Sequence, residues 1–232
     1  MEPHKELSAI EKFRPDLKSG PHAYFSKALE FARANYSEQM EEIASVQFQK
    51  VSQEYFFREY IWVVHATGFS AKAVGKFMPK LIQAYGPWNC LPDLPFPQAF
   101  ERVKIVCNNP QKSKAIYAMA KLMCDEMFRK DGTAVPWEEF RRNRLSSPEL
   151  LAKLPYVGKV TCFHLGRNIG LLECVKPDLH LIRMAEYWGF KNCEEMCRAV
   201  RPEGMPLGIV DLVFWYAAST FGTLEVRKDG QR

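Results

Sequence analysis

Two short stretches of this chain carry residues that could do chemistry together. The first is the turn Leu154-Pro-Tyr-Val-Gly158, and the second is Asp178, which follows Gly158 by 20 residues (178 − 158). Proline and glycine predict a tight turn between two helices. The N–H groups at the start of the second helix are a favourable place for a phosphate. A phosphate-binding turn at a set distance from one carboxylate indicates chemistry on nucleic acid.

The elements that must position these residues are predicted to be helices. No confident alternating strand pattern, repeat or low-complexity segment occurs, so the sequence predicts an all-α protein. Prolines 92, 95 and 97 predict a loop. Apolar residues recur at helical spacing over about residues 22–34, 37–44, 53–66, 71–85, 110–130, 137–140, 149–153, 159–168, 179–188, 193–200 and 209–220.

The amino-acid composition limits the classes of protein to which this chain can belong. At 232 residues the chain is long enough for one domain of ordinary size or for two small lobes that share a core. Hydrophobic residues make up 47% and charged residues 25%, which is typical of a globular, soluble protein. A net charge of +5 permits an anionic partner without requiring one.

The seven cysteines argue against a metal centre. They form no CxxC pair, and the two that lie one helical turn apart, Cys193 and Cys197, have no histidine nearby. Scattered cysteines in odd number are typical of reduced, buried thiols in an intracellular protein. The sequence also has no apolar leader and no membrane-length apolar run. We therefore expect an intracellular protein that uses no metal, no other cofactor and no membrane.

The stretch from Leu154 to Asp178 resembles the helix-hairpin-helix (HhH-GPD) DNA glycosylase superfamily. Members carry a hairpin close to L-P-G-V-G and an essential aspartate about twenty residues after its last glycine. Here the hairpin is Leu154-Pro-Tyr-Val-Gly158, and the aspartate is Asp178 in Pro-Asp-Leu-His-Leu-Ile-Arg183. Weaker similarity at residues 65–72 and 109–116 extends the resemblance over about residues 53–220.

The resemblance implies an all-α fold of two helical lobes with a central cleft, which the damaged base enters. In such proteins the N-terminal segment packs with the C-terminal helices. We therefore expect residues 1–55 plus 176–232 to form one lobe, and residues 56–175, with the hairpin, to form the other. The implied partner is double-stranded DNA that contains a damaged or modified base, bound by a monomer.

The sequence departs from the family pattern in three ways. Tyr156 replaces the middle glycine of the hairpin, so the turn must tolerate a side chain there or use it against the DNA. Bifunctional members place a nucleophilic lysine two residues after the last glycine, where this chain has Val160. Lys159 comes one residue earlier, and in a helix that shift rotates a side chain by about 100° away from the site. Finally, the four-cysteine cluster found at the C-terminus of some members is absent.

These residues imply hydrolysis by water. Breaking an N-glycosidic bond puts positive charge on the sugar, and a nearby carboxylate can stabilise that charge and orient or deprotonate the water. The resemblance makes Asp178 this catalytic carboxylate and makes the enzyme monofunctional. The plainer role for Asp178 is to cap the helix that follows it, and the two roles are compatible.

The resemblance also assigns contacts to the DNA backbone. The N–H groups of Val157, Gly158 and Val160, aided by Lys159 and with Tyr156 beside them, would bind a phosphate. Such a contact positions a protein on DNA without reading its sequence. A hairpin used purely for packing is the alternative.

The target base must leave the duplex before its sugar can be attacked, and another group must fill the vacated space. His65 occupies the family's position for that plug, although a histidine at the end of an apolar helix is otherwise a core or capping residue. Trp62, Phe69 and Trp215 are candidates for stacking on the flipped base, although aromatic residues more commonly fill cores. Alkylated purines, oxidised guanine, and uracil or thymine in mismatches all fit these residues.

Two rival functions stay open at this stage. In a bifunctional glycosylase/AP lyase, Lys159 would form a Schiff base with the DNA sugar. In a non-catalytic DNA-binding module, the hairpin would bind DNA and Asp178 would only cap its helix.

Overall fold

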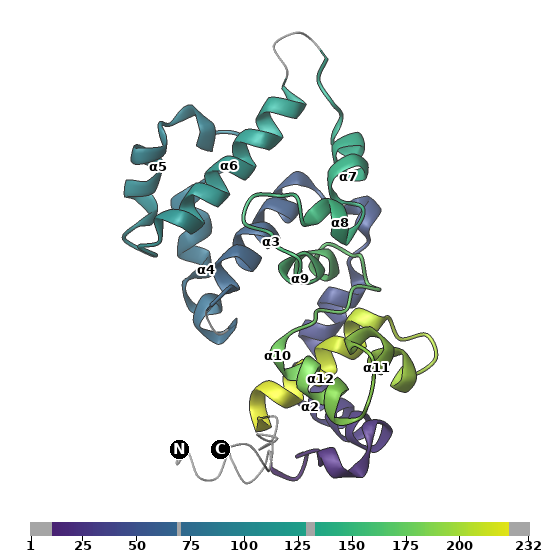
Figure 1. Ribbon diagram of the computed structural model, residues 1–232. Coiled ribbons are helices and arrows are strands. Elements are labelled where there is room, and N and C mark those ends of the chain that lie inside the picture. The colour runs from purple at the N-terminus through teal and green to yellow at the C-terminus, as the bar shows by residue number, and fades with distance from the viewer. Residues whose placement is uncertain (1–10, 69–70, 129–132, 223–232) are drawn as a thin grey trace, which may run out of the picture. The chain divides into compact units, whose positions relative to one another are not determined.

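The computed structural model describes residues 11–68, 71–128 and 133–222, and every regular element within these ranges is a helix (Figure 1). The prediction of an all-α protein is confirmed. None of the described helices combines the length and the apolar character needed to cross a membrane. The elements in chain order are η1 (Leu17–Ser19), α2 (Pro21–Ser45), η2 (Phe48–Lys50), α3 (Gln53–Ala66), α4 (Ala71–Tyr85), η3 (Leu91–Asp93), α5 (Phe96–Val103), α6 (Pro110–Met127), α7 (Trp137–Leu145), α8 (Pro148–Leu151), α9 (Thr161–Asn168), α10 (Leu179–Tyr187), α11 (Cys193–Val200) and α12 (Leu207–Phe221).

The chain forms two compact units. The terminal unit joins the part of the chain before residue 46 to the part after residue 171, and the central unit comprises residues 46–171. The boundaries expected from the sequence lie ten residues later (55 − 45) and four residues later (175 − 171). Residues 46–55 belong to the central unit because Val51 is buried in its core and Phe48 packs against that core.

The terminal unit is built on the pairing of α2 with α12 (Figure 1). α12 is buried along most of its length because apolar residues occur on every face. α2 bends at Tyr36, whose backbone leaves the helical region at φ −140° and ψ 22°. The ring of Tyr36 stacks on Tyr216 with centroids 4.0 Å apart. The sequence predicts a helix break between Asn35 and Ser37, and the bend confirms it.

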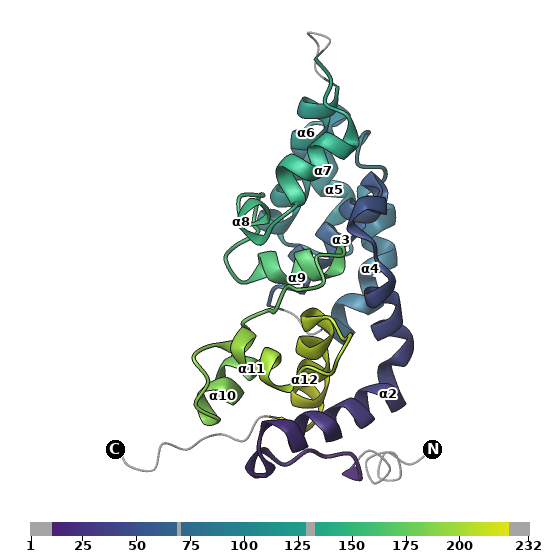
Figure 2. The same cartoon turned by 90° about the vertical axis from the view of Figure 1, so that its right-hand side faces the viewer.

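α3 lies at the centre of the central unit, where it contacts α4, α6 and α9 (Figure 2). Phe56, Tyr60 and Ile61 of α3 are almost completely buried, because this helix carries apolar residues on nearly every face. The methionine stripe of α6, which includes Met119 and Met123, is buried in the same core. The stripe is therefore a core face.

One predicted loop contains a helix. The prolines of segment 92–97 led to the expectation of a loop, but α5 begins at Phe96. Pro95 is the N-cap of α5 and Pro97 lies in its first turn, where the missing N–H of proline costs no hydrogen bond. Val103, at the end of α5, is completely buried. The expectation was wrong because prolines in a first turn are compatible with a helix.

Gly170, which follows α9, is a position where the fold requires glycine. Its φ is +90°, and a Cβ there would lie 2.6 Å from the Phe48 nitrogen and 2.8 Å from the Val46 oxygen. Both atoms belong to the backbone, so no side-chain rotation relieves the clash. We expect Gly170→Ala to lower the free energy of unfolding by about 3 kcal/mol or more in urea titrations, because overpacking adds to the strain of a positive φ.

Gly86→Ala is the matched control. Gly86 also has a positive φ, +69°, but a Cβ there meets no atom within 4 Å. This substitution should cost only the conformational strain, about 1 kcal/mol. Equal losses for the two variants would contradict the steric account of Gly170.

Candidate functional site

The predicted hairpin consists of α8, the turn that follows it, and α9 (Figure 1). Ser147 caps α8 by accepting a hydrogen bond from the Leu150 N–H. α9 begins at Thr161 rather than near Lys159 as predicted, because residues 158–160 still belong to the turn. The N-cap residue is Val160, whose side chain makes no capping bond. The N-terminus of α9 is therefore not covered by its own cap.

The turn is anchored from the core of the central unit. The side chains of Leu154 and Val157 are buried. The hydroxyl of Tyr60 on α3 donates to the Pro155 carbonyl and lies 3.3 Å from the Ala115 carbonyl. Burial raises the pKa of this hydroxyl, so it keeps the proton that it donates. The backbone before Tyr156 is therefore held by α3.

Tyr156 adopts a left-handed backbone conformation, with φ +61°. This is the position where the resemblance expects glycine, and a residue with a side chain is disfavoured there by about 1–2 kcal/mol. The side chain of Tyr156 is 44% exposed. The turn thus tolerates the side chain by directing much of it toward solvent.

The backbone N–H groups of the turn differ in whether they bond within the turn or face outward. The N–H of Val157 donates to the Leu154 carbonyl at 3.1 Å, so the prediction that it binds phosphate is wrong for this conformation. Gly158, Lys159 and Val160 are exposed, and within the described part of the chain their N–H groups donate to no backbone carbonyl. These three residues form the outward face of the turn.

Gly158 has no internal reason to be glycine. Its φ is not positive, and a Cβ there would meet no atom within 4 Å. Space is therefore left on the outer side of the turn, where a group from another molecule can approach the backbone closely.

Asp178 is the N-cap of α10 in the terminal unit. Its Oδ1 accepts the N–H groups of His180 at 3.0 Å and Leu181 at 3.2 Å. Its Oδ2 lies 4.0 Å from the Lys176 ammonium, and the side chain is 14% exposed. The capping interpretation is confirmed, and because Oδ1 makes both capping bonds, Oδ2 takes no part in the cap.

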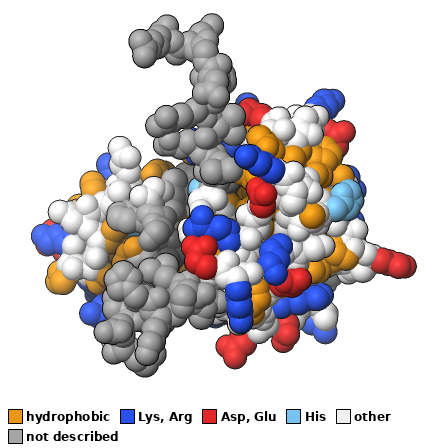
Figure 3. All heavy atoms as spheres, turned by 90° about the horizontal axis from the view of Figure 1, so that it is seen from below, with side chains coloured by type: hydrophobic (Ala, Val, Ile, Leu, Met, Phe, Trp, Pro, Cys, Tyr) orange, Lys and Arg blue, Asp and Glu red, His pale blue; other side chains and the backbone are white. Residues whose placement is uncertain are grey.

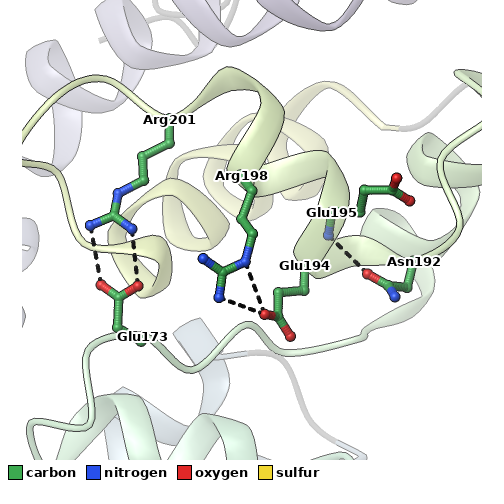
Figure 4. A network of polar contacts seen from close by, with 6 residues as sticks. All are labelled: Glu173, Asn192, Glu194, Glu195, Arg198 and Arg201. Carbon is green, nitrogen blue, oxygen red and sulfur yellow. Dashed lines mark hydrogen bonds and ion pairs between the residues drawn. The ribbon is translucent and has the colours of Figure 1, made fainter.

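The connector between α9 and α10 is tied at its start to the end of α11. Figure 4 shows the Arg201 guanidinium facing both carboxylate oxygens of Glu173, at 3.1 and 3.4 Å. The Nε of Arg201 also donates to the Met205 carbonyl at 2.7 Å. The neighbouring pair of Glu194 and Arg198 stays within α11. The Arg201 contacts link three segments of the terminal unit.

The same connector is tied to the first turns of α12. The Gly208 N–H donates to the Leu172 carbonyl at 2.7 Å, and the Lys176 N–H donates to the Asp211 carboxylate at 3.1 Å. Asp211 is 1% exposed. Asp211 lies inside α12 rather than at its start, and it holds the backbone two residues before Asp178. A lone acid in an apolar helix was the signal for this role.

The cysteine thiol near Asp178 and Asp211 is protonated. Burial, followed by the charges of Asp211 and Asp178, raises the pKa of Cys193 to about 11. All seven cysteines are free; Cys162, Cys174, Cys193 and Cys197 are buried, whereas Cys90 is exposed. Among the residues that the structure describes, no group of three or more His, Cys, Asp or Glu is placed to hold a metal ion.

His65 does not occupy a position from which it can enter DNA. It is completely buried in the central unit, with its Nε2 3.2 Å from the Tyr85 hydroxyl. Burial and then the nearby charge of Lys112 lower the pKa of His65 to about 4. The prediction that His65 is the plug is therefore wrong for this structure, because α3 turns this side chain into the core.

Lys112 on α6 is a buried cation that no motif in the sequence reveals. Its side chain is 2% exposed, and its Nζ donates to the carbonyls of His65, at 2.9 Å, and Thr67. These carbonyls end α3, where a positive charge is favourable. The spacing of residues around Asn109 gives no signal for this contact, since it joins positions 47 residues apart.

The proposed stacking residues lie on different units. Trp62 on α3 is half-buried against the core of the central unit, with its ring 3.8 Å from where a Cβ on Gly75 would lie. Trp215 on α12 is half-buried against the core of the terminal unit. Phe69 lies outside the described residues. The structure likewise places the hairpin on the central unit and Asp178 on the terminal unit.

Two arginines of α7 bind other groups of the protein itself. Arg141 donates to the Val51 carbonyl at 3.2 Å, and Arg144 pairs with Glu126. On the face drawn in Figure 3, blue basic and red acidic side chains are interspersed, with orange apolar side chains among them. The mild positive charge of the chain is thus not gathered into one basic surface on that face.

The buried histidine predicts a pH dependence of stability. Because the folded pKa of His65 lies near 4 and the unfolded value near 6.5, the unfolded chain binds an extra proton between these pH values. This contribution to stability is complete above pH 6.5 and is lost as the pH falls toward 4. We expect a loss on the order of 3 kcal/mol in urea titrations, and His65→Gln should remove it.

The control is His22→Gln, because His22 is exposed. It should leave the pH profile of the wild-type protein unchanged. A wild-type profile that His65→Gln fails to flatten would show that His65 is not buried in its neutral form.

No protein-family model matches this chain, and no curated protein matches it in sequence. Among solved structures, it is similar to the crystal structure of Methanocaldococcus jannaschii 8-oxoguanine glycosylase/lyase in complex with a 15mer DNA containing 8-oxoguanine. The TM-score is 0.58 and the identity 17%, over 84% of this chain and 96% of that chain. This chain therefore shares the helical fold of that glycosylase.

Proposed function

We propose that this protein is a DNA N-glycosylase that removes a damaged or modified base by hydrolysis. The observation that carries the proposal is the combination of two features: the fold of a glycosylase crystallised with lesion-containing DNA, and an N-cap aspartate, Asp178, whose Oδ2 makes no capping bond and lies 4.0 Å from the Lys176 ammonium. The partner is double-stranded DNA that carries the lesion, bound by a monomer.

In this proposal the hairpin holds the DNA backbone. The outward N–H groups of Gly158 and Val160 donate to a phosphate, and the exposed ammonium of Lys159 adds a positive charge beside it. The open space at Gly158 lets the phosphate approach the backbone. The internal bonds of Val157 and Pro155 keep the turn in the conformation that presents these groups.

Asp178 then acts on the sugar of the flipped nucleotide. Its Oδ1 is held by two backbone N–H groups, which fix the carboxyl group. Its Oδ2 stabilises the positive charge that develops on the sugar as the base leaves, and it accepts a proton from the attacking water. Asp211 and Gly208 serve as positioning residues, because they hold the connector that leads into Asp178.

Water is the proposed nucleophile because Val160 occupies the position of the family's lysine. Both Lys159 and Val160 precede α9, so the helical rotation expected between them does not apply directly. Lys159 instead lies exposed in the proposed phosphate-binding turn, where its proposed role is to contact the backbone of the DNA rather than the sugar of the flipped nucleotide.

Asp178→Asn separates catalysis from capping. Asparagine caps a helix as well as aspartate does, so stability and DNA binding should be retained. Excision should fall by about 100-fold or more, because the carboxylate charge is lost. The measurement uses duplexes that each carry one modified base, with 8-oxoguanine first, followed by alkali to reveal abasic sites.

Two outcomes would count against this function. Excision that survives in Asp178→Asn would remove Asp178 from catalysis. Binding of the duplexes by wild type without excision of any base would favour the rival of a non-catalytic DNA-binding module, in which Asp178 serves only as a cap.

A borohydride experiment distinguishes hydrolysis from lyase chemistry. If water is the nucleophile, wild type with lesion DNA and borohydride should give no covalent complex, and Lys159→Ala should change binding but leave the excision chemistry intact. A trapped complex that disappears in Lys159→Ala would establish the bifunctional rival, in which Lys159 forms a Schiff base.

A further inference from the structure

Tyr156 is the non-glycine residue that the structure holds at a positive φ within residues 11–68, 71–128 and 133–222. Its side chain is 44% exposed, and among the described residues no hydrogen bond, ion pair or ring contact involves it. Glycine would satisfy this backbone conformation without strain. No polar or ring contact within the described residues therefore accounts for a tyrosine at this position.

The strain is imposed by the surroundings of Tyr156. Tyr60 holds the Pro155 carbonyl on one side, and the Val157 N–H closes onto Leu154 on the other side. The buried side chains of Leu154 and Val157 keep the backbone of the turn from changing to another conformation. A strained residue that persists under such restraint points to a function for its side chain.

The exposed surroundings of Tyr156 indicate the kind of partner. The exposed ammonium groups of Lys153 and Lys159 lie before and after it in the chain, and the exposed Gly158 and Val160 complete the outer face of the turn. An aromatic ring set among cationic groups and free backbone N–H groups matches a nucleic-acid strand, which offers flat bases beside phosphates.

We propose that the Tyr156 ring stacks on a nucleotide of the DNA strand whose phosphate the hairpin holds. This inference rests on the proposed function and adds to it a contact that a hairpin with glycine at this position cannot make. The ring supplies a flat, partly apolar surface, while Lys159 and the Gly158 N–H supply the phosphate contact. The stacking contact raises affinity for DNA without selecting a base, because every base has a face that can stack.

The test compares variants of Tyr156 that lack an aromatic ring with variants that keep one. Tyr156→Gly and Tyr156→Asn remove the ring and suit a positive φ, whereas Tyr156→Phe and Tyr156→Trp keep a ring. The full-length proteins are titrated by fluorescence anisotropy with a duplex that contains a tetrahydrofuran abasic-site analogue. Thermal unfolding of each variant is measured in parallel.

We expect the two ringless variants to bind about fivefold more weakly or worse, the amount that one lost stacking contact explains. Their melting temperatures should be equal to or higher than that of wild type, because the strain is relieved. Tyr156→Phe and Tyr156→Trp should bind within about twofold of wild type.

Three results would overturn the inference: ringless variants that bind as tightly as wild type, a Phe variant that binds as weakly as the Asn variant, or lower melting temperatures in both ringless variants. Failure of the proposed function looks different, since wild type itself would then excise no base. If wild type excises a base and the ringless variants bind normally, only the role of Tyr156 is lost.

Discussion

The hydrogen bond from the Lys176 N–H to the buried carboxylate of Asp211 organises the part of the chain that leads to Asp178. A carboxylate that is 1% exposed is unfavourable unless polar partners compensate for the loss of water. The backbone of the connector supplies one such partner, and the Gly208 N–H binds the connector again at Leu172. The position of the candidate acid is thus set by α12, the most apolar helix of the terminal unit, rather than by the connector's own sequence.

The hairpin depends on a comparable contact in the central unit. The Tyr60 hydroxyl reaches out of the core to the Pro155 carbonyl, and the rings and aliphatic side chains around it bury Leu154 and Val157. The outer side of the turn is left with exposed groups only. Each unit therefore follows the same plan, in which a buried polar group fixes a surface segment that carries the candidate chemistry.

His65 and Lys112 illustrate how the core uses polar residues that look functional in a sequence. The Lys112 ammonium donates to two carbonyl groups at the C-terminal end of α3. Its charge helps to keep the neighbouring His65 neutral. Both residues are almost completely buried, so their role in the described structure is to fix the end of α3. In this conformation the His65 side chain is not available to a partner outside the core.

The sequence by itself determined the features that depend on near neighbours. Helical periodicity predicted α3, α6 and α11 closely, and proline, glycine and capping residues predicted the hairpin turn and the cap at Asp178. These features are local because a helix and its cap involve residues only a few positions apart. The same rules missed α5, where prolines in a first turn were taken as breakers.

Only the tertiary structure decided which side chains and N–H groups are available. The burial of His65, the left-handed Tyr156 and the bond between Lys176 and Asp211 all depend on residues that are far apart in the chain, 35 positions in the last case. Spacing along a sequence carries no information on such contacts, because they follow from how helices pack against one another. For the same reason, the inward bond of the Val157 N–H could not be foreseen from a motif that matches the family at that residue.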